Sequence, residues 1–136
     1  MLIFQINYLA VIVAAVIYMG VAALWYSPLM FGRSWMRENK LDEETLEQRG
    51  MFPALAYAFI AALVLAFGIA MLIALTDRVS WFGGTLIGLF AGVLISAPAA
   101  LPVYVFENRS LHLYALNEGM PVVAFAIMGA VIGGWQ

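Results

Sequence analysis

One carboxylate stands well inside an apolar stretch of this sequence. Glu118 lies in the run 111–135, which is long and apolar enough to cross a membrane. A charge inside a bilayer costs roughly 2.5–3.5 kcal/mol on insertion scales, so an ionisable residue there predicts a functional site. Two interpretations stay open for Glu118. It responds to protons or cations, or it is a structural glutamate that is neutral or reaches the membrane surface.

Five further polar residues accompany Glu118 near one end of the last two apolar runs: Asn117, His112, Glu107, Arg109 and Ser96. Ser96 lies beside Pro98, where a hydroxyl can bond to a backbone carbonyl that proline leaves free. Glu107 and Arg109 either form an ion pair at the membrane boundary or each face water. His112 is typical of a histidine at headgroup level. We treat the set as a candidate polar site within the membrane.

Several kinds of chemistry are excluded or unsupported. The chain has no cysteine, which excludes disulfides, thiolate catalysis and cysteine-ligated metals. It has no zinc-binding H-E-x-x-H pattern, nucleophile elbow or phosphate loop, and a single histidine with scattered carboxylates gives no metal pattern. The net charge of −2, without a basic stripe, gives no sign of nucleic-acid binding. We therefore expect no enzyme activity, no cofactor and no nucleic-acid partner.

Composition indicates which elements must position these residues. Of the 136 residues, 65% are hydrophobic and 10% are charged, whereas soluble domains are about a quarter charged. The sequence predicts an all-α membrane protein with one domain over 1–136. Its four transmembrane helices cover about 3–25, 53–75, 81–106 and 111–135, with a short amphipathic segment between the first two.

The connections between spans contain recognisable signals. Amphipathic aromatic side chains and a proline follow the first span, which predicts an interfacial anchor there; a binding role for this corner is the less favoured alternative. The anchor residues are Trp25, Tyr26, Pro28 and Trp35. In the polar segment 33–50, Asp42 is a candidate cap for a short helix that ends at Gly50. Pro98 and Pro102 predict a kink in the third span.

Small residues recur every four positions in two spans, which places them on one helix face and permits close packing in lipid. They are Gly84, Gly88 and Gly92 in the third span and Ala58, Ala62 and Ala66 in the second. Because a short turn over 76–80 joins these spans, we expect an antiparallel pair in which the glycines contact the alanines. Similar strips in the other spans exceed the needs of one pair, which predicts a homo-oligomer, with a dimer favoured.

Basic residues are unevenly distributed between the two sides. The segment 33–50 and the turn at 107–110 hold five of them, and the opposite side has only Arg78. The positive-inside rule then predicts a multi-pass protein of the cell membrane, with the 33–50 loop in the cytoplasm and both termini outside.

Two blocks of sequence resemble a family of small integral membrane proteins, domain of unknown function 1761. The first block is Leu24-Trp25-Tyr26-Ser27-Pro28 with Phe31-Gly32 and Trp35-Met36. The second is Phe106-Glu107-Asn108-Arg109 with Leu111, Leu113, Asn117, Gly119 and Gly129. The resemblance covers nearly the whole chain and implies four spans, but no activity or catalytic residue. The sequence departs from it at Glu118 and Pro121.

Two functions fit these observations. The first is a small homo-oligomeric transporter or channel for a small solute or ion, using Glu118, Asn117 and the proline-containing half of the third span. The second is a structural or interaction protein of the membrane, without transport or catalytic activity. Membrane lipids are partners in either case. An enzyme acting on a lipid-like substrate is the least favoured alternative.

Overall fold

The computed structural model describes residues 6–42, 44 and 52–135, and helices are the only regular secondary structure in those residues. The elements are α1 (Tyr8–Trp25), α2 (Gly32–Glu38), α4 (Phe52–Thr76), α5 (Trp81–Phe90), the π-helical segment η2 (Ala91–Ser96), α6 (Ala97–Phe106) and α7 (Leu111–Gly134). Four helices are long and apolar enough to cross a membrane: α1, α4, the continuous helix Trp81–Phe106, and α7. The predicted all-α membrane fold with four spans is confirmed.

Polar side chains cap the helices at the positions where the spans begin. The Asn7 side chain accepts a hydrogen bond from Ala10 N–H at 3.2 Å. Ser80 caps α5 and Ser110 caps α7 in the same way. Such caps satisfy N–H groups that have no partner within the helix. In the polar segment, the helix that the structure describes is α2, and the predicted helix over 42–50 falls largely outside the described residues.

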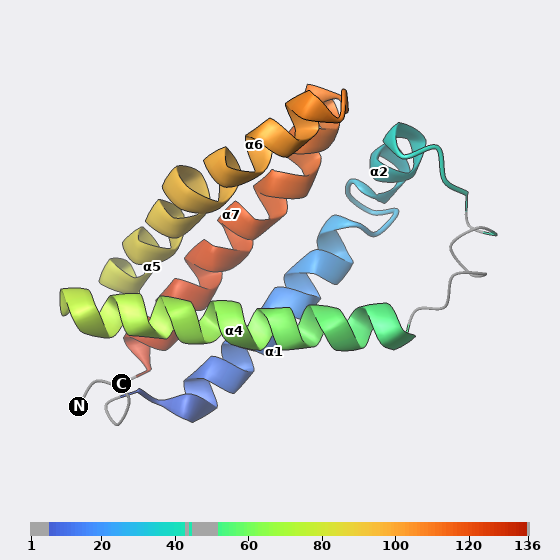
Figure 1. The fold of residues 1–136 in the computed structure, drawn as a ribbon. Helices are drawn as coiled ribbons and strands as arrows, with labels where there is room; N and C mark the ends of the chain where they lie inside the picture. The colour runs from blue at the N-terminus through green and yellow to red at the C-terminus, as the bar shows by residue number, and fades with distance from the viewer. Residues whose placement is uncertain (1–5, 43, 45–51, 136) are drawn as a thin grey trace.

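Helix α7 lies at the centre of the bundle. The helix formed by α5, η2 and α6 runs antiparallel to it along one side, and α1 lies along the other side (Figure 1). α4 crosses in front of α1 and also contacts α7. The two ends of the described chain meet, because the Asn7 amide donates to the Trp135 carbonyl at 2.9 Å. The described part of the chain therefore begins and ends on one side of the bundle.

The glycines of α5 and η2 face α7, and the prediction that they contact the alanines of the second span is wrong. A Cβ added to Gly84 would overlap the Gly129 carbonyl, and one added to Gly88 would overlap the Phe125 carbonyl. At Gly92 it would lie 2.8 Å from Val122 Cα. α4 and α5 diverge from their shared turn (Figure 1), whereas α7 offers a smooth surface along the whole glycine face.

The alanines of α4 pack elsewhere. Ala62 and Ala66 are fully buried, in one core cluster with Ala10 and Ala14 of α1, and Ala58 is only partly buried. Small side chains on both helices let the backbones of α4 and α1 approach where the helices cross. The second span therefore contacts the first more extensively than it contacts the third.

The third span changes helical type before its first proline. The six residues of η2 form a π-helix, in which the N–H of Ala97 donates to the Gly92 carbonyl, five residues earlier. This wider turn accommodates Pro98, which has no N–H to donate. The structure therefore has a π-helical segment just before the prolines at which the sequence predicts a kink, and Ser96 is the last residue of that segment.

Candidate functional site

A hydrogen-bonded chain of three polar side chains joins three helices near one end of the bundle. The Tyr26 hydroxyl, just after α1, donates to Asn117 Oδ1 of α7 at 3.1 Å. Asn117 Nδ2 in turn donates to the Tyr104 hydroxyl of α6 at 2.7 Å. Tyr104 is only 6% exposed. Because a buried polar group is costly without a partner, the Asn117 amide satisfies two otherwise unpaired hydroxyls at once.

Trp25 makes a second connection between α1 and α7. Its indole Nε1 donates to the backbone carbonyl of Leu116 at 2.9 Å. The ring lies over Gly119, where an added Cβ would be 3.1 Å from Trp25 Cζ2. Glycine at position 119 therefore leaves the space that the indole ring occupies. Trp25 and Tyr26, which the sequence places at the membrane boundary, bond to two consecutive residues of α7.

A tight turn between α1 and α2 holds these aromatic residues. The N–H of Phe31 donates to the Trp25 carbonyl at 2.9 Å, and the two rings lie 4.5 Å apart. Trp35 of α2 packs edge-on against Tyr26, with ring centroids 5.6 Å apart. A Cβ on Gly32 would overlap the Tyr26 carbonyl. The turn positions Tyr26, whereas Pro28 is exposed at its outer edge.

Glu118 points toward the irregular segment of the third span. Its carboxylate, which is partly buried, lies close enough to the Ser96 hydroxyl at the end of η2 to interact with it. The sequence predicts that Ser96 bonds to a backbone carbonyl near Pro98, and the structure places its hydroxyl near the one ionisable side chain well inside α7. Tyr18 of α1 is also close enough to interact electrostatically with Glu118. Glu118 is thus bordered by a hydroxyl of η2 and a phenol of α1.

Sequence analysis did not single out three tyrosines of this cluster, Tyr18, Tyr104 and Tyr114. The Tyr114 hydroxyl donates to the Ala97 carbonyl at 2.7 Å, and the Tyr104 and Tyr114 rings pack edge to face with centroids 5.4 Å apart. The available signal was the residue type, since a tyrosine inside an apolar span needs a partner for its hydroxyl. We name the polar cluster by its members: Tyr18, Trp25, Tyr26, Ser96, Tyr104, Tyr114, Asn117 and Glu118.

Three predicted site residues lie outside the polar cluster, at the end of the bundle. Glu107 and His112 are exposed. Arg109 lies with its guanidinium 4.7 Å from the centre of the Tyr104 ring, and it donates to Asn39 Oδ1 at 3.4 Å. Arg109 therefore contacts the cluster at the Tyr104 ring. Of the predicted set, the structure brings together Asn117, Glu118 and Ser96.

The electrostatics at the edge of the cluster keep Tyr26 neutral. Burial, together with the negative charges that Tyr18, Tyr104 and Glu118 can carry, raises the pKa of the Tyr26 phenol to about 12. A neutral phenol keeps its proton across the physiological range. Tyr26 therefore remains a hydrogen-bond donor to Asn117.

The chemistry available to the polar cluster is that of one carboxylate among neutral donors and acceptors. In the part of the chain that the structure describes, no three His, Cys, Asp or Glu side chains gather in a way that could hold a metal ion. A single carboxylate with nearby hydroxyl groups can bind a proton or a cation, and tyrosine rings also attract cations.

Comparison with known proteins places the chain in a sequence family. The family model described as "Protein of unknown function (DUF1761)" matches residues 9–133. Searches of curated proteins and of solved structures found no match. Both blocks of the sequence resemblance lie inside the matched range. In the structure they meet, because Trp25 and Tyr26 of the first block contact Asn117 and Gly119 of the second.

Proposed function

The chain belongs to the DUF1761 family of proteins of unknown function, and we propose that it is a small transporter or channel that binds a proton or small cation at Glu118. The observation that carries the proposal is the position of Glu118 beside Ser96. A carboxylate partly buried inside an apolar helix faces a hydroxyl on the irregular segment of a neighbouring span. Such residues in membrane proteins commonly belong to ion pathways and proton relays.

The backbone around Glu118 supports the same function. π-Helical segments and proline-interrupted spans occur often at binding sites of membrane proteins, because local irregularity leaves backbone groups near a ligand. η2 and Pro98 lie on one side of Glu118, and Pro121 lies in α7 one turn beyond it. A π-helical segment and a proline thus lie beside this carboxylate, and a second proline lies in its own helix.

The pathway itself is proposed to lie between copies of the chain. One copy has a packed centre of alanine, methionine and isoleucine side chains, including Ala14, Met128 and Ile132, each at most 1% exposed. Such a centre leaves little room for an aqueous path, so we propose a homo-oligomer, with a dimer favoured, and no enzymatic step. We also propose that it lies in the cell membrane with the 33–50 loop in the cytoplasm and both termini outside, as the distribution of basic residues predicts.

The test is ion movement into vesicles that contain the purified protein. Proton flux is followed with an internal pH-sensitive dye, and sodium and potassium flux with ion-selective dyes. We expect wild-type flux above that of empty vesicles, and at least tenfold less with Glu118→Gln, because the amide cannot carry the charge that offsets a bound cation. The matched control is Glu44→Gln, which removes an exposed carboxylate from the segment between α2 and α4.

The outcomes separate the function from the site. Flux that persists in Glu118→Gln would show that the ion binds elsewhere. Absence of flux for every ion in wild-type vesicles would favour the second candidate, a structural or interaction protein. The observation behind that candidate is that the polar side chains at this end are engaged with one another, as in the chain from Tyr26 through Asn117 to Tyr104.

A further inference from the structure

Two neighbouring apolar hollows lie between α4 and the third span. The larger of them, about 390 Å³, lies between α4 and η2 and is also lined by Phe125 of α7. The second, about 310 Å³, lies between the end of α4 and α5. Leu72 lines both hollows. We call the two together the α4–α5 groove. It exists because α4 and α5 diverge from their turn.

The α4 wall of the groove lacks a side chain at one position. Gly68 lines the larger hollow, and a Cβ added there would meet no atom within 4 Å. Protein interiors are close-packed, and an empty apolar hollow forfeits dispersion contacts along its walls. In a bilayer no water is at hand to fill it. The surface around Gly68 is therefore suited to an apolar occupant that the chain itself does not supply.

One end of the groove is polar and includes a cationic side chain. Arg78, which is exposed, lines the part next to the turn between α4 and α5. The N-terminus of α5 begins two residues later at its cap, Ser80, and helix N-termini favour negative charge. Arginine binds phosphate well because its planar guanidinium donates two parallel hydrogen bonds. An anionic group is favoured at this end and only apolar groups are favoured along the rest.

The length of the groove fits one lipid tail. Its α4 wall extends from Val64 to Thr76, which is roughly 18 Å of helix. The hydrocarbon of one leaflet is about 15 Å deep, half of the roughly 30 Å core. Arg78 then lies at the level of the headgroups. A helix from a second copy is less suitable, since its apolar surface would cover Arg78 and leave that charge unpaired.

We propose that the α4–α5 groove holds one acyl chain of an anionic phospholipid whose phosphate binds Arg78. The lipid fills the hollow beside Gly68 and fixes α4 relative to α5. This site is separate from the cation site, so it does not depend on whether the protein transports an ion. Ser96 borders both sites, since it lines the larger hollow of the groove and lies close to Glu118.

The experiment is native mass spectrometry of the detergent-purified protein after incubation with phosphatidylglycerol or, separately, phosphatidylcholine. Wild type should retain one phosphatidylglycerol per chain in preference to phosphatidylcholine. Gly68→Leu should lower retention of both lipids about tenfold by filling the groove. The matched control is Gly20→Leu, because Gly20 of α1 is equally open, with no atom within 4 Å of an added Cβ. It should retain lipid as wild type does.

Arg78→Gln tests the headgroup separately. It should abolish the preference for phosphatidylglycerol while the groove still retains a lipid of either kind. If Gly68→Leu does not fold, this measurement tests the proposal in its place. Equal retention by wild type and a folded Gly68→Leu would overturn the proposal. The proposal would also be overturned if the dimer disappeared from the mass spectrum of Gly68→Leu while lipid retention stayed unchanged. A second copy of the chain would then be the occupant of the groove.

Discussion

Tyr26 and Asn117, 91 residues apart in the sequence, share a hydrogen bond of 3.1 Å that fastens the end of α1 to α7. Asn117 extends the connection to Tyr104 at 2.7 Å, so one amide joins three helices. The neighbouring carboxylate, Glu118, lies close to Ser96 of η2, in the same span as Tyr104. A short stretch of α7 therefore both holds the helices together and presents the ionisable group.

The connection between Tyr26 and Asn117 can be measured with a double-mutant cycle. We expect Tyr26→Phe and Asn117→Leu each to lower the free energy of unfolding. Their coupling should be about 0.5–1.5 kcal/mol, the range of hydrogen bonds inside proteins and membranes. The measurement is denaturant unfolding in mixed micelles, followed by circular dichroism. Additive effects of the two substitutions would show that the hydrogen bond contributes nothing to stability.

The close contact between the glycine face of α5 and α7 predicts how substitutions there change the free energy of unfolding. Gly88→Ala places a Cβ on the Phe125 carbonyl and should lower the free energy of unfolding by about 1–3 kcal/mol, since the backbones must move apart. Gly68→Ala is the control on α4. Its Cβ meets nothing, so stability should stay the same or rise by up to about 1 kcal/mol, the gain in helix propensity. Equal effects of the two substitutions would contradict the close contact between α5 and α7.

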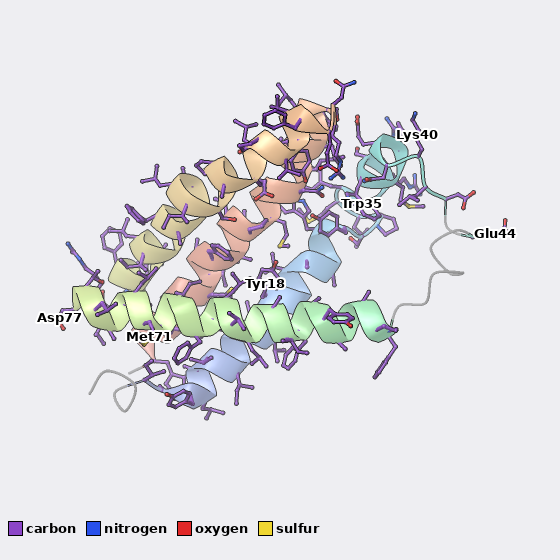
Figure 2. All side chains as sticks on the ribbon, in the orientation of Figure 1. Tyr18, Trp35, Lys40, Glu44, Met71 and Asp77 are labelled. Atoms are coloured by element: carbon purple, nitrogen blue, oxygen red, sulfur yellow. The ribbon has the colours of Figure 1, made fainter. Side chains whose placement is uncertain are left out.

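The orientation in the membrane can be tested with single cysteines, because the natural chain has none. Val79→Cys lies in the turn between α4 and α5, and Glu44→Cys lies between α2 and α4. Figure 2 labels Asp77 of that turn and Glu44 toward opposite ends of α4. A membrane-impermeant maleimide should label Val79→Cys on intact cells. It should label Glu44→Cys only after the membrane is opened. The reverse pattern would overturn the proposed orientation.

The extent of the spans could be predicted closely from the sequence. The expected 53–75, 81–106 and 111–135 correspond to α4, the helix Trp81–Phe106, and α7. These boundaries depend on local signals, namely apolar run length, capping residues and proline, which act within a few residues of the chain. Carbon atoms cover the long faces of the bundle, and nitrogen and oxygen gather at its ends, as a membrane protein requires (Figure 2).

The partners of each face could not be predicted, because they depend on how the helices cross. The glycines of α5 contact α7 and not α4, although α4 is the sequence neighbour. Spacing shows that a smooth strip exists but does not identify the helix that covers it. The same limit applies to the site. Glu118 and Ser96 were each identified from residue type, whereas their meeting depends on the register between η2 and α7.

The central claim, that Glu118 binds the transported proton or cation, is tested most directly by its chemical modification. A hydrophobic carbodiimide reacts with protonated carboxyl groups inside membranes, and peptide mass spectrometry locates the modified residue. We predict that Glu118 is the principal site labelled in membrane-embedded protein. We also predict that the ion moved in the vesicle assay protects it, and that Ser96→Ala alters the extent of labelling. Labelling of other carboxylates with Glu118 unmodified, or labelling of Glu118 that no ion reduces, would contradict the claim.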